Sequence, residues 1–272
     1  AGPIGVFLGH CIGAVLIHYF ANNIAFFVSC ISALVALFLT TRIQDVHDPV
    51  QAPTLKACIT GARQQLADRS VWLIGILATV VILVPFATRD TLTPVYAEQL
   101  GARAGILALL GNIHLLFYGL AIALCSSVFY QRLGLVKTAV LGIVLQVIST
   151  FGIPFTSNIY VIYLWQALAG FSFGMAFAAF MSLSVVNTSS DEQSTRMGLF
   201  QTIYSCGMFV GPVMMGVMMQ HINLSSGYIL IAALSVVAAI ATPLSARWVY
   251  ARKTQTSAQL LKNGAYAAAP DQ

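Results

Sequence analysis

Long apolar stretches separated by short polar segments dominate the chain. About 20 mostly apolar residues are needed for a helix to cross the roughly 30 Å hydrocarbon core of a bilayer. Eight stretches have this length, at residues 2–20, 23–41, 71–97, 105–129, 136–154, 158–186, 197–220 and 227–247. Stretches such as Val71 to Ala87 are nearly continuous in apolarity, whereas the strands of a membrane barrel alternate apolar and polar residues. The pattern predicts an all-α membrane protein with eight transmembrane helices.

One long polar connection divides these spans into two groups. It contains Pro49 and Pro53 and an amphipathic stretch from Thr54 to Leu66, which is typical of a helix on a membrane surface. The predicted parts are the last two helices of an N-terminal bundle at 1–41, a cytoplasmic linker at 42–70, a C-terminal six-helix bundle at 71–248 and a cytoplasmic tail at 249–272. The tail has no apolar period and is expected to be disordered.

Composition and charge agree with a protein embedded in a membrane. Charged residues are 8% of the chain and apolar residues 58%, against about a quarter charged in soluble domains. Basic residues favour the cytoplasmic side of short loops. With the first span running outward, nearly all Lys and Arg of the connections lie inside, while Arg103 lies outside. We therefore expect a plasma-membrane protein with both termini of this chain in the cytoplasm. The net charge of +5 follows from this topology and gives no reason to expect a nucleic-acid partner.

A short repeat relates the first span to the seventh. Gly5-Val6-Phe7-Leu8-Gly9 returns as Gly207-Met208-Phe209-Val210-Gly211, and another apolar span follows each copy. A hairpin that returns after six helices is typical of a two-halved transporter. Small residues at a four-residue spacing let helix backbones approach closely, and a proline bends its helix. We expect a role in helix packing or conformational change for Gly5, Gly9, Gly13, Gly207, Gly211 and Pro212, with plain helix packing as the alternative.

Two adjacent charged residues, Arg89 and Asp90, fall inside the third span. A charge at the centre of a bilayer costs about 2.5 kcal/mol or more. Adjacent helical residues point about 100° apart, so each is expected to need a partner on another helix or water. One alternative is that the helix ends just before the pair. The other continues the helix, distorted by Pro85 and Pro94, and gives Asp90 a proton-coupling role.

Aromatic and amide side chains recur at spacings of three and four on the sixth and seventh spans. A buried amide in lipid must find a hydrogen-bond partner, which makes Asn112, Gln166 and Gln201 hard to explain as filler. The candidate substrate-binding residues are Arg89, Asn112, Tyr163, Gln166, Phe173, Gln201, Tyr204 and Met208. Both stripes are also compatible with ordinary bundle core. Adaptable methionine and aromatic surface favours an amphipathic or aromatic substrate over a sugar.

The remaining reactive residue types give no sign of a metal site, a cofactor or an enzyme. Histidine is the residue type that ordinarily titrates near neutral pH, but lone histidines on apolar helices, as at His10, His18 and His114, are more often structural. The five cysteines are scattered without a C-x-x-C pair, as small apolar fillers are. There is no phosphate-binding loop and no set of nucleophile, base and acid.

Several of these motifs resemble the major facilitator superfamily, from the fifth helix of its twelve-helix pattern to the end. The family's exporters carry G-x-x-x-G-P-x-x-G-G in that helix; the glycines at 5, 9 and 13 match, and His10 replaces the proline. Gln131-Arg132-Leu133-Gly134 resembles the family's D-R-x-G loop. Glu192, Arg196 and Gly198 resemble the acidic, basic and glycine residues that the family often shows before its eleventh helix.

The resemblance implies a secondary transporter that works by alternating access between two helix bundles. Its drug-exporter branch implies proton-coupled efflux of small amphipathic molecules, with Arg132 and Gly134 as the cytoplasmic loop motif. It also implies four more helices upstream, so the chain is expected to be truncated. Import by uniport or symport, and a membrane receptor without transport, stay open as alternatives. The expected partners are the lipid bilayer, a small-molecule substrate and protons as a candidate coupling ion.

Overall fold

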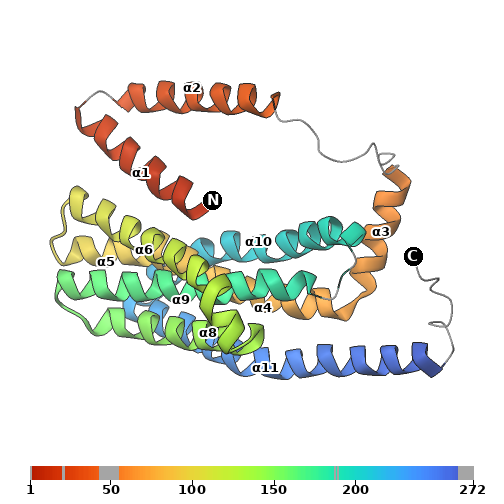
Figure 1. Cartoon of the computed structure of the whole chain (residues 1–272). Helices are drawn as coiled ribbons and strands as arrows, with labels where there is room; N and C mark the ends of the chain where they lie inside the picture. The colour runs from red at the N-terminus through yellow and green to blue at the C-terminus, as the bar shows by residue number, and fades with distance from the viewer. Residues whose placement is uncertain (1, 20–21, 43–54, 187, 189, 263–272) are drawn as a thin grey trace.

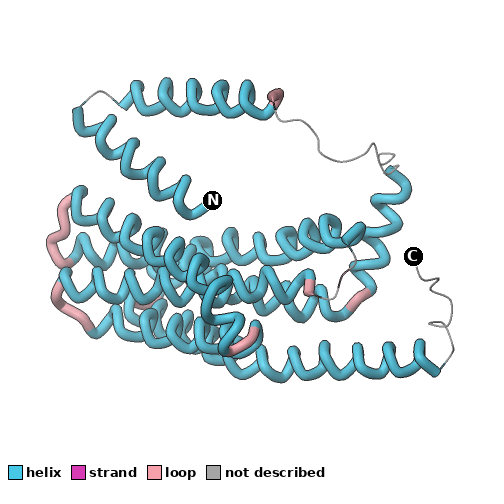
Figure 2. The backbone as a smooth tube through the Cα atoms, viewed as in Figure 1, coloured by secondary structure: helices cyan, strands magenta, loops and turns pink. Residues whose placement is uncertain are grey.

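A computed structural model describes residues 2–19, 22–42, 55–186, 188 and 190–262 of the chain. Every regular element in these residues is helical (Figure 2), which confirms the predicted all-α class for this part of the chain. The elements are α1 (Gly2–Tyr19), α2 (Asn22–Thr40), α3 (Leu55–Ala67), α4 (Arg69–Ala87), η1 (Thr88–Leu92), α5 (Thr93–Gln99), α6 (Ala104–Leu124), η2 (Cys125–Phe129), α7 (Tyr130–Arg132), α8 (Leu135–Gly152), η3 (Ile153–Phe155), α9 (Ile159–Val185), α10 (Ser190–His221) and α11 (Leu224–Lys262).

Six helices in the described part of the chain are long and apolar enough to cross a membrane. They are Arg69–Gln99, Leu109–Arg132, Leu135–Phe155, Ile159–Val185, Glu192–His221 and Leu224–Ala246. The predicted number was eight, and the first two are not confirmed. The described side chains cover only part of α1 and α2, and the apolar run described in α2, Phe26–Thr40, is too short to span.

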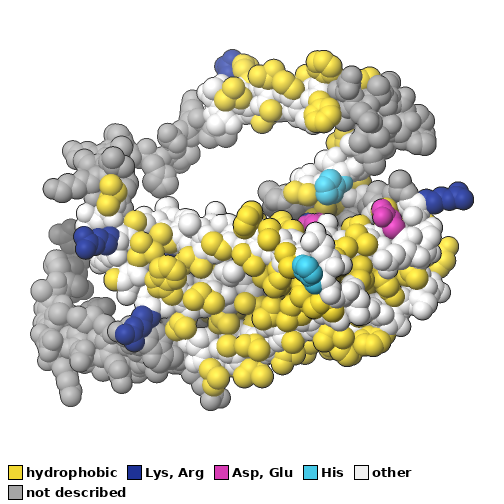
Figure 3. Space-filling view, turned by 180° about the vertical axis from the view of Figure 1, so that it is seen from behind, with side chains coloured by type: hydrophobic (Ala, Val, Ile, Leu, Met, Phe, Trp, Pro, Cys, Tyr) yellow, Lys and Arg dark blue, Asp and Glu magenta, His cyan; other side chains and the backbone are white. Residues whose placement is uncertain are grey.

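The six spans form one bundle in which successive helices run in opposite directions (Figure 1), with α1 and α2 as a hairpin beside it. α4 and α9 lie at the centre, because about two thirds of the residues in their most apolar stretches are buried. Figure 3 shows hydrophobic side chains across the middle of the visible face, with Lys and Arg side chains near its ends. This distribution suits a bundle surrounded by lipid.

The last helix continues beyond the predicted end of the bundle. α11 runs to Lys262, so the prediction of a disordered tail is wrong for residues 249–262, and residues 263–272 lie outside the described part. Residues 244–262 contain no glycine or proline and are rich in good helix formers. Adding turns to a helix that already exists avoids the unfavourable nucleation step. The helix therefore continues even though residues 249–262 lack the apolar period on which the prediction of disorder rested.

Glycines bring the central helices into close contact. A Cβ atom at Gly170 would clash with the backbone carbonyl of His114 on α6, and one at Gly207 would clash with that of Thr79 on α4. Gly211 also lies close to α4, where a Cβ would come within 3.0 Å of the Leu83 oxygen. The other predicted packing stripe differs, since within the described residues no atom of another element lies within 4 Å of a Cβ built at Gly5, Gly9 or Gly13. Pro212 lies inside α10, directly after the contacts with α4.

Gly207→Ala is expected to destabilise the bundle, whereas Gly216→Ala on the same helix is not. The added methyl at position 207 must push α10 away from Thr79, and overpacking of this kind typically costs about 1–3 kcal/mol. Gly216 has no atom within 4 Å of its Cβ position, so alanine there gains about 0.5–1 kcal/mol of helix propensity. Thermal unfolding in detergent measures both; equal shifts would contradict the close contact between α4 and α10.

Candidate functional site

The helix that carries Arg89 and Asp90 continues past them. α4, η1 and α5 follow one another without a break and form a single candidate span, Arg69–Gln99. The predicted continuation is therefore confirmed, and the alternative of a helix that ends before the pair is wrong. η1 is a widened turn in which Thr93 N–H donates to the carbonyl of Thr88. Pro94 has no N–H and cannot bond to the preceding turn; widened turns of this kind occur frequently at functional sites.

Arg89 and Asp90 form an ion pair with each other. Arg89 Nε donates to Asp90 Oδ1 at 2.6 Å and Nη2 donates to Oδ2 at 2.7 Å, with the two side chains 20% and 37% exposed. Of the two predicted alternatives, a partner on another helix is not found among the described residues, because the two side chains pair with each other; their partial exposure leaves the other alternative, contact with water, open. The guanidinium also lies 5.9 Å from the ring centre of Phe86, within cation–π range.

An aromatic cluster lies beside this ion pair. It consists of Tyr118 on α6, Phe173 and Phe177 on α9, and Tyr204 on α10. Their ring centres follow one another at 4.8, 5.3 and 5.2 Å. Phe86, whose ring lies under the Arg89 guanidinium, packs against the core that contains these four rings. The cluster thus combines a paired charge with several ring faces inside the spans, which suits a ligand with both apolar and polar parts.

A buried polar network lies deeper in the bundle. Gln166 Nε2 donates to Thr93 Oγ1 at 3.0 Å, and that hydroxyl lies 2.9 Å from the hydroxyl of Tyr228. His114 is 1% exposed and its ring centre lies 6.3 Å from that of Phe173. Within the described residues, Gln166 Oε1 and both ring nitrogens of His114 are buried without a hydrogen-bond partner. The bundle interior therefore keeps unused hydrogen-bonding capacity next to the aromatic cluster.

The predicted substrate-binding residues divide into two groups in the structure. Phe173, Tyr204 and Met208 lie in or against one core, Gln166 belongs to the buried polar network, and Arg89 is paired with Asp90. Asn112 is half-buried on α6, and Gln201 is exposed on α10. Tyr163 packs apart from the cluster, near Leu110, and its hydroxyl donates to the Ile106 carbonyl at 3.4 Å.

Four members of the site lay outside the predicted set. Tyr118, Thr93 and Tyr228 were not among the candidates, and His114 was interpreted as a structural residue. A sequence signal existed, because His114 and Tyr118 are four residues apart and so share one face of a helix. What that face would contact was not visible in the pattern.

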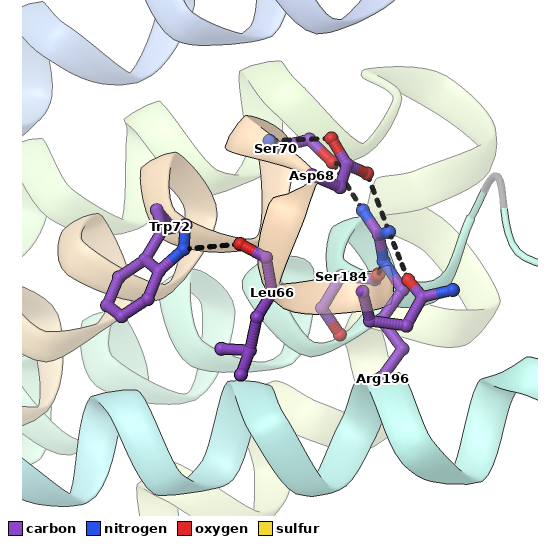
Figure 4. A network of polar contacts seen from close by, with 7 residues as sticks. Leu66, Asp68, Ser70, Trp72, Ser184 and Arg196 are labelled. Atoms are coloured by element: carbon purple, nitrogen blue, oxygen red, sulfur yellow. Dashed lines mark hydrogen bonds and ion pairs between the residues drawn. The ribbon is translucent and has the colours of Figure 1, made fainter. Parts of the chain in front are cut away.

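A second polar cluster, the Arg196 network, ties four elements together at the other end of α4 (Figure 4). Arg196 Nε donates to the Ser184 carbonyl at 2.6 Å, and Nη1 donates to Gln65 Oε1 at 2.9 Å and to Asp68 Oδ2 at 2.8 Å. Nη2 donates to the hydroxyl of Ser70. Asp68 also caps α4, since its Oδ1 accepts from Ser70 N–H at 2.9 Å. A single guanidinium thus holds α3 and the starts of α4 and α10 to the end of α9.

The Asp68 carboxylate keeps its charge in this network. Partial burial acts to raise the pKa of Asp68, but the hydrogen bonds from Ser70 and Arg196 and the charge of Arg196 outweigh burial, so its pKa lies below the ordinary value of 3.8. Hydrogen bonds and an opposite charge both favour the ionised form of a carboxyl group.

The free energy of unfolding is expected to decrease as the pH is lowered, because the contribution of the Asp68 carboxylate is lost. Because the folded-state pKa of Asp68 is lowered, its contribution is complete above the unfolded value of about 3.8 and is lost as the pH falls from there through the folded value. The stability difference between the chain and Asp68→Asn should therefore be constant from pH 7 to 5 and shrink below pH 4. Thermal unfolding at each pH measures it; a difference that stays constant down to pH 3 would contradict the charged network.

The predicted loop motif lies between α7 and α8. Gly134 has φ of +77°, a left-handed conformation that glycine adopts without strain, and it reverses the chain between two helices. Arg132 is exposed at the end of α7. No group of three His, Cys, Asp or Glu side chains that could hold a metal ion occurs within the described ranges.

Together, six apolar spans with an ion pair and an aromatic cluster among them define a polytopic membrane protein. The family model of the Major Facilitator Superfamily matches residues 86–269, which include both the ion pair and the aromatic cluster. The chain belongs to the Major Facilitator Superfamily, a family of membrane transporters. No curated protein matches the chain.

Proposed function

We propose that the protein is a secondary active transporter that exports small amphipathic or drug-like molecules in exchange for protons. The observation that carries the proposal is the Arg89–Asp90 pair beside the aromatic cluster. An ionisable pair inside a span is expensive, and its presence there indicates a functional role. Asp90 is the acid of the pair and the proposed proton carrier.

In the proposed mechanism, protonation of Asp90 breaks the ion pair. The freed guanidinium of Arg89 then needs another partner, so proton binding and the state of the substrate site become linked. Ring faces of Phe173 and Tyr204 would hold the flat apolar part of a substrate, and the thioether of Met208 would adapt to its shape. Asn112, Gln166 and the less central Tyr163 and Gln201 would supply polar contacts. Alternating access moves the site from one side of the membrane to the other.

The proposed orientation places the Arg196 network on the cytoplasmic side of the plasma membrane. Arg69, Arg132 and Lys137 flank helix ends on that side of the bundle, whereas Arg103 lies in the connection between α5 and α6 at the opposite end. Such an excess of basic residues supports a cytoplasmic location. The same orientation puts both termini of this chain in the cytoplasm.

Flux measurements in liposomes test the proposal. The full product of the gene is reconstituted with a pH dye inside, and ethidium is supplied as a flat aromatic cation. Antiport predicts that a pH gradient drives ethidium movement. It also predicts that protons leave when ethidium enters, so that the internal pH rises, and that the internal pH falls when ethidium leaves. Ethidium movement without a pH change would establish uniport, and movement of ethidium and protons in the same direction would establish symport. Ethidium binding without flux would indicate a receptor. Each of these outcomes overturns the proposal.

A further inference from the structure

A groove on the outer surface of the bundle separates α4 from α11. It encloses about 830 Å³ and is lined mainly by apolar side chains, among them Trp72, Ile76 and Leu244, with Arg69 at one end. These three apolar side chains are exposed, at 45%, 54% and 60%. The volume is in the range of small-molecule sites, but the groove opens to the lipid side of the spans.

Arg69 is a cation at one end of this groove with no ion pair in the part of the chain that the structure describes. The acid next to it in sequence, Asp68, is occupied by Arg196 and Ser70. Arg69 is exposed and has no ion pair with any other described residue. It begins the span Arg69–Gln99 and therefore lies at headgroup level. A fixed cation above an apolar channel is complementary to a phosphate that carries an acyl chain.

Trp72 lies one turn below Arg69, and its position is fixed. Its indole N–H donates to the carbonyl of Leu66 at 2.9 Å, which holds the ring at the wall of the groove (Figure 4). Tryptophan favours the boundary between headgroups and hydrocarbon. The groove is distinct from the site at Arg89, because 20 residues of helix separate Arg69 from Arg89, a rise of about 30 Å.

We propose that this groove binds an anionic glycerophospholipid from the adjacent leaflet. The phosphate would lie on Arg69, and one acyl chain would run along Trp72 and Ile76 between α4 and α11. A zwitterionic lipid of the same chain length would fill the apolar part but carry no net charge to complement Arg69. This inference does not depend on the proposed transport function or on which end of the bundle is cytoplasmic.

Fluorescence quenching tests the proposal in bilayers. The chain is placed in vesicles that mix unlabelled lipid with phosphatidylglycerol or phosphatidylcholine brominated near the top of the acyl chains. The signal of Trp72 is the difference between the chain and Trp72→Phe. We expect brominated phosphatidylglycerol to quench Trp72 with about fivefold higher relative affinity than brominated phosphatidylcholine, the factor that corresponds to about 1 kcal/mol for one basic residue near an anionic surface.

The matched variants are Arg69→Gln and Arg132→Gln. Arg132 is an exposed arginine at the same end of the bundle that does not line the groove. The preference should disappear in Arg69→Gln and persist in Arg132→Gln. Equal quenching by both lipids in the unmodified chain, or equal loss of preference in both variants, would overturn the site, since the second result indicates only a general charge effect.

Discussion

Arg196→Met lowers the free energy of unfolding of the bundle by about 2–4 kcal/mol, because a buried hydrogen-bonded ion pair is broken and its partners stay behind. Arg196 is 8% exposed. Methionine keeps the apolar stem but leaves the Gln65 amide and the Ser184 carbonyl without their donor. The Asp68 side chain is 37% exposed, so water recovers part of its solvation and limits the loss. Unfolding in mixed detergent micelles measures the change.

The control for this substitution is Arg132→Met at the same end of the bundle. Arg132 is exposed, and exposed substitutions usually change stability by less than about 0.5 kcal/mol. A second measurement separates local from global effects. If Arg196 holds α3 against α10, trypsin should cut after Arg63 faster in Arg196→Met at temperatures where the bundle is still folded. Unchanged stability together with unchanged cleavage would mean that the network does not hold α3.

Local hydrophobic patterning was sufficient to predict most of the helices. The predicted span at 158–186 differs by one residue at each end from α9, Ile159–Val185, because a run of about 20 apolar residues is a local property of the chain. For the third span the sequence left two alternatives open, and the structure shows that the helix continues through Arg89. The tail was misjudged because an amphipathic period is needed for a helix to pack but not for α11 to continue beyond the bundle.

Only some residues of the candidate site were among the predicted ones, and its contacts were not predictable. Gln166 and Phe173 were identified from helical spacing, and Gln166 does bond to another helix through Thr93. The mutual pairing of Arg89 and Asp90 occurs within a widened turn, and the spacing of an ideal helix reveals neither the turn nor the pairing. The Arg196 network joins residues more than 120 positions apart. Such contacts depend on which sides of the helices pack against each other, and local sequence patterns do not determine this packing.

Asp90→Asn is expected to abolish proton-coupled transport while the protein still folds. Asparagine has nearly the same shape and still accepts a hydrogen bond from Arg89, but it does not bind or release a proton. Because asparagine keeps the shape of the side chain and one hydrogen bond from Arg89, we expect the variant to fold, and unfolding in detergent checks this. In the liposome assay, ethidium movement driven by a pH gradient should fall to the level of empty liposomes.

The matched variant is Asp90→Glu, which keeps an ionisable group one methylene further from the backbone. It should retain coupling at a reduced rate, because the proton carrier is present but displaced from Arg89. Ethidium binding measured without a gradient separates loss of coupling from loss of the site, since the ring faces of Phe173 and Tyr204 are unchanged in both variants. Coupled flux in Asp90→Asn equal to that of the unmodified protein would assign the proton to another residue, and His114, buried beside Gln166 with both ring nitrogens unbonded within the described chain, would be the first to test.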